Sequence, residues 1–396
     1  MIPKSGNRLS DKITLKRKSN MAKRKRSAAT PLVISRTGHF YVGGRIDRTI
    51  EGSPMVGQMY VEFWTPRTPR SPYPVVMIHG NWQTGTNFTG TPDGRDGWAQ
   101  YFLRQGYAVY IVDQVARGRS PHFSMSQGAV GPANLDRTEH RFVAPKRFNL
   151  WPQARRHTQW PGSGKPGDKH FDAFYATQFQ SLIDNEKSQE INRDAVVALL
   201  DRIGPAIVLT HSQSGAYGWL IGDARPKLVK AIVAIEPNGP PVYESAFKGP
   251  PDWFEDTGPR KPFGLSFVPL AYDPPLKPGE ALAFVRQHKP NAPDLVRTWL
   301  QAEPARKLPN LSKIPVLIVV AEASYHAAFD HCTADYLAQA GVPVTFLRLE
   351  DAGLRGNGHM MMLEKNSDEI AGLLVAWLKK TLRSFRGAPK ARTRNP

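Results

Sequence analysis

The sequence predicts a mostly parallel β-sheet covered by helices on both faces. Short apolar runs of strand length alternate with amphipathic helical segments along most of the chain, which is typical of a parallel sheet joined by crossover helices. The 396 residues suffice for one large domain or two modest ones. No repeat of about 20 to 50 residues occurs, so a solenoid or a propeller is excluded.

The predicted strands are short apolar runs that end at glycine, proline or a polar residue. Residues 39–44 and 58–64 are bounded by glycine or proline. Later runs, such as residues 74–79, are apolar almost throughout and therefore predict strands that are buried on both faces. We expect these buried strands at residues 74–79, 107–112, 206–210, 229–235, 315–320 and 342–349.

The predicted helices carry their apolar residues on one stripe. Between Ala195 and Leu200 apolar residues recur at helical spacing, and Gly204 ends the segment. By the same criteria we expect helices at residues 94–105, 192–203, 216–224, 293–302, 327–339 and 367–382.

Two long insertions rich in proline, glycine and aromatic residues interrupt this pattern, at about residues 117–168 and 237–310. We expect them to form a lid above the carboxyl ends of the strands, where sheets of this class place their functional sites. The chain therefore divides into a basic tail at residues 1–31, one folded domain at 32–382 and a second basic tail at 383–396.

The net charge of +19 lies mainly at the two ends of the chain. Residues 1–31 carry ten Lys or Arg against one Asp, and residues 379–396 carry seven against no acidic residue, which leaves +3 for the rest. A nucleic-acid-binding domain would show a basic face with interleaved aromatic residues on its folded body. We therefore expect solvated, disordered tails and no nucleic-acid binding except through them.

Signals for membranes, export and disulfides are weak. No apolar stretch approaches the ~18 residues of a membrane span, and no apolar core of about 7 to 15 residues marks a secretory signal. We therefore expect a cytoplasmic protein without a membrane span, with Met21 as a candidate true start. Cys332 is the single cysteine, so an intrachain disulfide and a thiolate metal cluster are excluded. The oligomeric state is not indicated.

The clearest chemical signal lies between a predicted strand and a predicted helix, in Thr210-His-Ser-Gln-Ser-Gly215. A tight turn there would project a serine hydroxyl from the sheet edge, as in a nucleophile elbow, and the first N–H groups of the helix could stabilise a developing anion. Small residues are needed two positions on either side of Ser212, and Thr210 and Ser214 replace the usual glycines. Ser212 is the candidate nucleophile; Ser214, inside the helix, is a weaker rival, and a Ser-rich helix cap is the non-catalytic alternative.

The loop after the first buried strand is a candidate for an oxyanion hole. The run from His79 to Trp82 ends that strand, where enzymes with a nucleophile elbow place one backbone N–H donor; the other follows the nucleophile. This nominates the backbone N–H groups of Asn81 and Gln213.

A serine nucleophile needs a base and an acid that orients the base. His359 lies in a glycine-rich loop between the last strand and the last helix and is the candidate base. Two acids compete: Glu236 ends the strand after the elbow helix, and Glu322 ends the next strand, the more usual position. His326 and His331 are expected at a helix surface or cap.

Further segments strengthen this interpretation because they occur together in one order. In chain order they are His79-Gly80, Thr91-Pro-Asp-Gly94, Gly97-Trp98, Tyr101-Phe-Leu-Arg104, Gly106-Tyr107, Asp113-Gln114, Arg117-Gly-Arg-Ser120, His211-Ser-Gln-Ser-Gly215, Glu236-Pro237, Tyr272-Asp-Pro-Pro275 and Gly356-Asn-Gly-His-Met-Met361. Over roughly residues 32–382 the chain resembles a group of bacterial esterases with the α/β-hydrolase fold and an H-S-Q-S-G elbow. The resemblance implies that fold, with Ser212 as nucleophile, His359 as base and Glu236 as acid.

One departure from that group concerns the substrate. Its esterases can carry adjacent cysteines after His-Gly, where this chain has Asn81 and Trp82, so a disulfide at the oxyanion hole is impossible here. Trp82 would narrow the acyl side of the pocket. Together with Trp151, Phe267 and Tyr272 from the insertions it makes up the expected pocket wall, which favours an ester with a compact hydrophobic or aromatic part.

We therefore expect a serine hydrolase that cleaves a small-molecule carboxylic ester through an acyl-enzyme, with no cofactor and no metal. An amidase, a thioesterase or a lactonase would use the same triad. A dehalogenase or an epoxide hydrolase would require Asp in place of Ser212. A non-catalytic scaffold whose basic tails bind acidic partners would need no reactive serine.

Overall fold

An eight-stranded mixed sheet lies at the centre of the structure, a computed structural model that describes residues 31–250 and 253–384. Its strands are β1 (Ile34–Ile46), β2 (Met55–Pro66), β3 (Val75–Ile78), β4 (Val109–Asp113), β7 (Ala206–His211), β8 (Val229–Ile235), β13 (Val316–Val320) and β14 (Val344–Arg348). They follow the order β1-β2-β4-β3-β7-β8-β13-β14. β1, β2 and β4 pair antiparallel, and from β4 to β14 all pairs are parallel.

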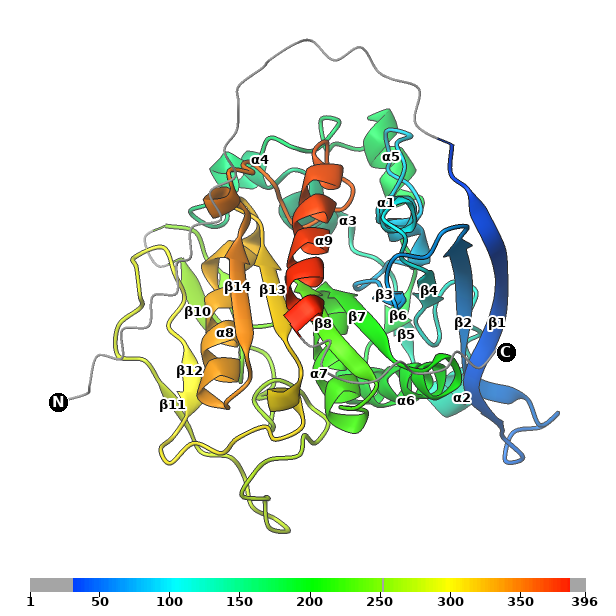
Figure 1. Cartoon of the computed structure of the whole chain (residues 1–396). Coiled ribbons are helices and arrows are strands. Elements are labelled where there is room, and N and C mark those ends of the chain that lie inside the picture. Colours follow the sequence, from blue (N-terminus) through cyan, green and yellow to red (C-terminus); the bar gives the residue numbers. More distant parts are fainter. Residues whose placement is uncertain (1–30, 251–252, 385–396) are drawn as a thin grey trace. The chain divides into compact units, whose positions relative to one another are not determined.

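Helices cover both faces of this sheet (Figure 1). The residues of α1 (Trp98–Arg104) and α9 (Ser367–Ser384) pack in the core on one face. Those of α6 (Asn185–Ile203), α7 (Gly215–Ala224) and α8 (Asp330–Gln339) pack in the core on the other. The predicted fold class is confirmed.

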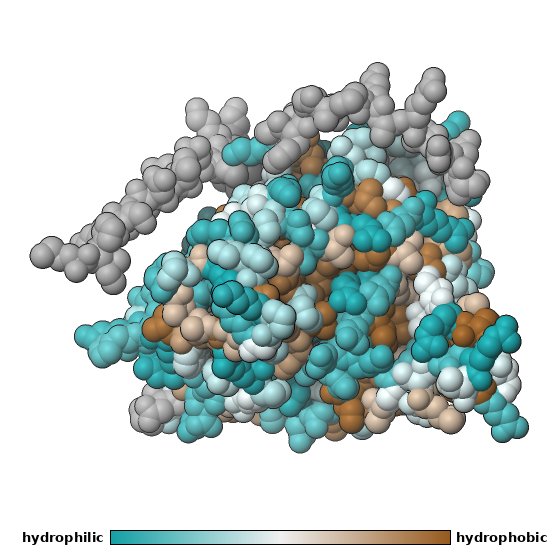
Figure 2. Space-filling view, turned by 90° about the horizontal axis from the view of Figure 1, so that it is seen from below, coloured by the Kyte–Doolittle hydropathy of each residue, from teal (hydrophilic) through white to brown (hydrophobic). Residues whose placement is uncertain are grey.

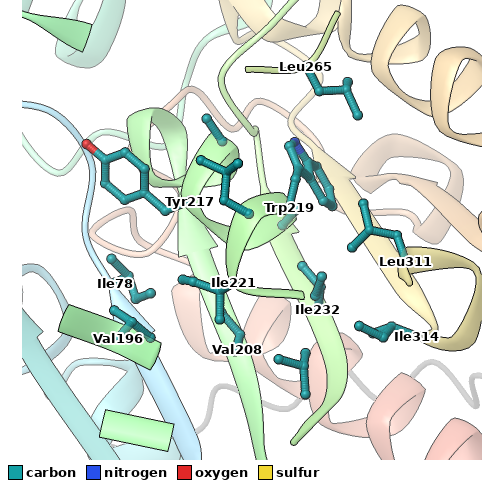
Figure 3. Packing of buried hydrophobic residues seen from close by; sticks show 14 of the residues in the cluster. Ile78, Val196, Val208, Tyr217, Trp219, Ile221, Ile232, Leu265, Leu311 and Ile314 are labelled. Carbon is teal, nitrogen blue, oxygen red and sulfur yellow. The ribbon is translucent and has the colours of Figure 1, made fainter. Parts of the chain in front are cut away.

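The core under α6 and α7 explains why the strands are apolar throughout. Val208 and Ile232, from neighbouring strands, are fully buried and meet Val196 of α6 and Trp219 and Ile221 of α7 (Figure 3). The alternate residues of the same strands point to the core on the opposite face. Burial of both faces fixes the carboxyl ends of β3, β7 and β8 side by side.

One predicted helix is wrong. Residues 293–302 contain a short strand, β12 (Trp299–Gln301), which pairs antiparallel with β11 (Phe284–Arg286). Val296, an apolar residue of this segment, packs into a small cluster with Phe329 and Cys332. Tertiary packing therefore overrides the local helical pattern.

The insertions form short elements rather than regular layers. The first contains α2 (Ser124–Gln127), β5 (Val130–Gly131), α3 (Leu135–Arg137), a π-helical turn at Thr138–Val143, α4 (Pro145–Phe148) and a short turn at Ala154–Arg156; α5 (Lys169–Tyr175) and β6 (Ser181–Leu182) follow it. The second contains the hairpin of β9 (Glu244–Phe247) and β10 (Phe254–Thr257), then β11 and β12.

Nearly all of the two predicted basic tails, residues 1–30 and 385–396, lies outside the described residues. α9 extends two residues into the predicted second tail.

On the face shown in Figure 2, hydrophobic residues lie in patches between hydrophilic ones. None of the helices in the described ranges combines the length and the apolar character that a membrane span requires.

Candidate active site

A cavity of about 250 Å³ lies beside the carboxyl end of β7, and Ser212 is part of its wall. The loop after β3, the elbow, both insertions and the segment after β13 all contribute to this wall. The lining residues are Asn81, Trp82, Arg137, Arg141, Phe142, Asn185, Ser212, Gln213, Asn238, Gly239, Glu244, Ser245, Phe247, Tyr325, His326 and Phe329. Both insertions therefore do lie over the strand ends.

Ser212 occupies a strained turn between β7 and α7. Its φ of 55° is in the left-handed region that non-glycine residues rarely adopt. Two glycines allow neighbouring chain segments to approach this turn closely. A Cβ on Gly80 would lie 3.0 Å from the Cβ of Ser212, and a Cβ on Gly215 would lie 2.4 Å from that of Pro237. The sequence therefore folds locally as an elbow with β3 and β8 tightly against it.

Ser214, the rival nucleophile, has a role in the turn itself. Its fully buried hydroxyl accepts a hydrogen bond from the backbone N–H of His211 at 2.9 Å and lies 2.8 Å from the carbonyl oxygen of Ile78. The structure thus places Ser212 on the cavity and Ser214 behind it.

The two backbone N–H groups proposed for an oxyanion hole belong to residues that line the cavity. Within the described residues no hydrogen bond uses the backbone N–H of Asn81 or Gln213. The buried Arg117 connects both sides, because it donates to the carbonyl oxygen of Gly80 at 2.9 Å and to the side chain of Gln213 at 3.4 Å. In the sequence analysis this arginine belongs to the segment 117–120 but has no role at the site; its place in the loop after β4 was the available signal.

Glu236 and His359 form a buried pair. The Nδ1 atom of His359 lies 2.6 Å from Oε2 of Glu236, and neither side chain is exposed. Oε2 also accepts a hydrogen bond from Ser324 at 2.6 Å, and Oε1 accepts one from the backbone N–H of Ala321 at 2.9 Å. Three hydrogen bonds therefore fix the orientation of this carboxylate and, through it, of the imidazole.

Glu322, the alternative acid, does not contact His359. It accepts hydrogen bonds from the Arg355 side chain at 2.8 Å and from the backbone N–H of Gly356 at 2.9 Å. It therefore anchors the loop that carries His359 rather than the histidine itself.

Tyr325 lies beside the histidine and shares the cavity wall with Ser212. Its hydroxyl lies 3.4 Å from Nε2 of His359. His359 is not itself part of the cavity wall, but three rings of the wall pack on it: Tyr325 at 4.8 Å, Phe142 at 5.1 Å and His326 at 4.9 Å between centroids.

The sequence predicts His326 and His331 at a helix surface or cap. The surface position is wrong, because both are buried, but each lies in the first turn of a helical segment. The chain after β13 first makes a tight turn at Tyr325–Ala328, so α8 begins only at Asp330 and the turn points inward. Nδ1 of His326 lies 2.7 Å from Oδ1 of Asp330, and Nε2 of His331 lies 3.2 Å from the carbonyl oxygen of Val296.

Burial controls the protonation of the pair. It raises the pKa of Glu236 to about 7, and it lowers the pKa of His359 well below its usual value, with the charges of His326 and Arg141 adding to that decrease. Because the two groups share one hydrogen bond, their titration belongs to the pair. The imidazole is therefore a free base around neutral pH.

Of the four expected pocket aromatics, the structure places Trp82 on the cavity wall, with a φ of 61°. Trp151 lies one layer behind the wall, where it is buried against Phe247 and Tyr325. Its indole N–H donates to the carbonyl oxygen of Ala323 at 3.2 Å.

Phe267 and Tyr272 are not pocket residues. The Tyr272 hydroxyl lies 2.9 Å from the Tyr336 hydroxyl, within the core beneath α7 and α8. The backbone N–H of Phe267 donates to the side chain of Gln189 in α6. This part of the second insertion closes the hydrophobic core and therefore cannot line the cavity.

Glu236, His326 and His359 also satisfy the geometric requirement for a metal site, because one ligand atom of each lies within 4.8 Å of the others. Both carboxylate oxygens of Glu236 already accept hydrogen bonds. A cation there would have to replace the network that orients His359.

Residues 75–373 match the model of the Alpha/beta hydrolase family, and the chain therefore belongs to that family. It is 47% identical over 344 residues to "Probable secreted lipase phiG" of Fungal sp. (strain ATCC 74256), with 87% of this chain and 90% of that protein covered. A solved structure, that of "a Novel Bacterial Esterase", matches 90% of this chain and 99% of its own at 24% identity and a TM-score of 0.58, and this similarity supports the fold. The protein is thus a hydrolase of the α/β family with lipase and esterase relatives.

The expected cytoplasmic location is wrong on this comparison. The relative matched over most of the chain is named a secreted protein, which points to secretion instead. The expectation depended on the absence of an apolar leader, and such an absence carries less weight than this match.

Proposed function

We propose that the protein is a serine hydrolase that cleaves a carboxylic ester through an acyl-enzyme. The carrying observation is that Ser212 lies on the cavity wall in a left-handed turn, and that Tyr325 of the same wall contacts Nε2 of a histidine, His359, that forms a buried pair with Glu236. The names of the relatives, a lipase and an esterase, favour an ester over an amide as substrate.

In the first half-reaction, Oγ of Ser212 attacks the carbonyl carbon while Nε2 of His359 takes the serine proton. The carbonyl electrons move onto oxygen, and the resulting oxyanion accepts hydrogen bonds from the backbone N–H groups of Asn81 and Gln213. His359 then gives its proton to the departing alcohol, and the carbon–oxygen bond to that alcohol breaks. Glu236 holds Nδ1–H throughout, so Nε2 remains the atom that exchanges the proton.

In the second half-reaction, water replaces the alcohol. Nε2 of His359 takes a proton from the water as its oxygen attacks the acyl carbon, and it returns this proton to Oγ of Ser212 when the acyl–serine bond breaks. The products are a carboxylic acid and the regenerated serine.

The test combines covalent labelling with turnover. A fluorophosphonate probe should label the folded wild type at Ser212, and Ser212→Ala should abolish both labelling and hydrolysis of p-nitrophenyl acetate. Matched thioester and anilide substrates should react more slowly than the ester. An unlabelled, folded wild type, or a Ser212→Ala variant with undiminished turnover, would contradict the proposal.

A further inference from the structure

Two arginines on the cavity wall form no ion pair within the described residues. Arg137 and Arg141 both line the cavity that contains Ser212, and neither forms an ion pair or donates a side-chain hydrogen bond within the described ranges. Their side-chain contacts are with aromatic faces. The guanidinium of Arg137 lies 5.7 Å from the ring centroid of Trp82, and that of Arg141 lies 5.3 Å from that of Tyr325.

Two other arginines of the same insertion form ion pairs, and Arg155 and Arg156, for which the described residues show no ion pair, are exposed. Arg119 lies 2.7 Å from Asp113, and Arg147 lies 2.9 Å from Glu139. Arg141, in contrast, is half-buried. Burial lowers the pKa of Arg141, and the charge of Glu244 opposes this decrease only in part. A partly desolvated guanidinium without an ion pair is costly, and a bound anion would offset that cost.

Arg141 is also close to the reacting groups. It lies over the ring of Tyr325, whose hydroxyl contacts Nε2 of His359, and the next residue, Phe142, stacks on His359 itself. A molecule that reaches both Arg141 and Ser212 fits the small cavity between them. The two groups can therefore hold different ends of one substrate.

The charge of the wall indicates which anion fits. Glu244 is the single carboxylate among the lining residues, set against two guanidinium groups. The wall therefore lacks one negative charge, which matches a monoanion better than a doubly charged phosphate ester. A carboxylate also suits the planar, two-pronged donor geometry of arginine.

We propose that the substrate is an ester that bears a free carboxylate, bound by Arg141 with support from the charge of Arg137. This inference depends on the proposed hydrolase function, because it assigns the substrate class of the same cavity.

The experiment compares two pairs of esters that differ in one charge. Mono-p-nitrophenyl adipate against p-nitrophenyl hexanoate places the charge on the acyl part; p-acetoxybenzoate against its methyl ester places it on the alcohol part. The wild type should show the higher kcat/KM for the anionic member of at least one pair. Arg141→Met should lower kcat/KM for that anionic ester by about 10- to 100-fold and for its neutral partner by less than about threefold, as expected when charge-assisted hydrogen bonds are lost.

Two further variants serve as controls. Arg147→Met removes a paired arginine of the same insertion and should leave both esters unchanged. Glu244→Gln removes the competing carboxylate of the wall and should increase the preference for the anionic ester.

The outcomes separate the two proposals. Hydrolysis without preference for the anion in either pair, or an equal loss for both esters in Arg141→Met, would overturn this inference and leave the hydrolase intact. Failure to hydrolyse any of the four esters would instead overturn the proposed function.

Discussion

Replacing Glu236 by Gln tests the proposed triad directly, because both oxygens of this carboxylate are committed. One oxygen accepts from the backbone N–H of Ala321, and the other faces His359 and Ser324. An amide has one oxygen and one NH₂ group in their place. If its oxygen faces Ala321, the NH₂ group donates to Nδ1 of His359, and the proton moves to Nε2, where it blocks the uptake of the serine proton. If its oxygen faces His359, the NH₂ group faces the backbone N–H of Ala321, and two donors then lie opposite each other without an acceptor.

Either orientation removes the negative charge that stabilises the imidazolium. The corresponding change in a serine protease costs ~10⁴ in turnover, which is about 5.5 kcal/mol of transition-state stabilisation. We expect a loss of this order for Glu236→Gln. For Glu322→Gln, whose partners are Arg355 and the backbone of Gly356, we expect a loss of about tenfold or less, since only the support of the His359 loop is weakened.

The measurement is kcat/KM for p-nitrophenyl acetate for both variants, with the free energy of unfolding determined in parallel so that variants of matched stability are compared. If Glu322→Gln is the more damaging change, or if Glu236→Gln costs less than about tenfold, Glu236 is not the acid of the triad.

Four other perturbations have clear expected results. Ser212→Gly should relieve the strain of the left-handed turn, whereas Ser212→Ala should keep it, and both variants should be inactive. The glycine variant should therefore have a free energy of unfolding about 1 kcal/mol higher than the alanine variant. Equal denaturation midpoints of the two variants would contradict this. Trp82→Ala should increase the rate for p-nitrophenyl octanoate relative to acetate, and a wild type that already prefers octanoate would refute the crowding argument. Because the charge of Arg141 lowers the pKa of His359, Arg141→Met should raise that pKa and move the acid limb of kcat/KM for a neutral ester to higher pH; an unmoved or lowered limb would refute it. Deleting residues 1–31 should leave turnover of p-nitrophenyl acetate nearly unchanged, and a large loss in well-folded protein would show that this segment contributes.

The strand-end residues of the site could be predicted from sequence because regular structure positions them. An apolar run that ends in Glu236, or a strand–turn–helix around Ser212, has a fixed place once the sheet is recognised. The positions of Tyr325 and Arg141 could not be predicted in this way. They depend on a tight turn and a π-helical turn that follow no simple hydrophobic period. Tyr272 shows the converse, since an aromatic residue of an insertion joins the main core.

Three residues of the site have left-handed backbone conformations. Ser212 and Glu236 directly follow β7 and β8, and Trp82 lies in the loop after the neighbouring strand β3; their φ values are 55°, 45° and 61°. Ser212 and Trp82 line the cavity, and Glu236 faces His359. A left-handed residue at a strand end breaks the alternation of the strand and turns its side chain away from the two packed faces of the sheet. Each such residue costs of order 1–3 kcal/mol and persists only where the surroundings determine it. Glycine would relieve the strain but would also remove the side chain, so the strain at these three positions is best explained by the groups that they present.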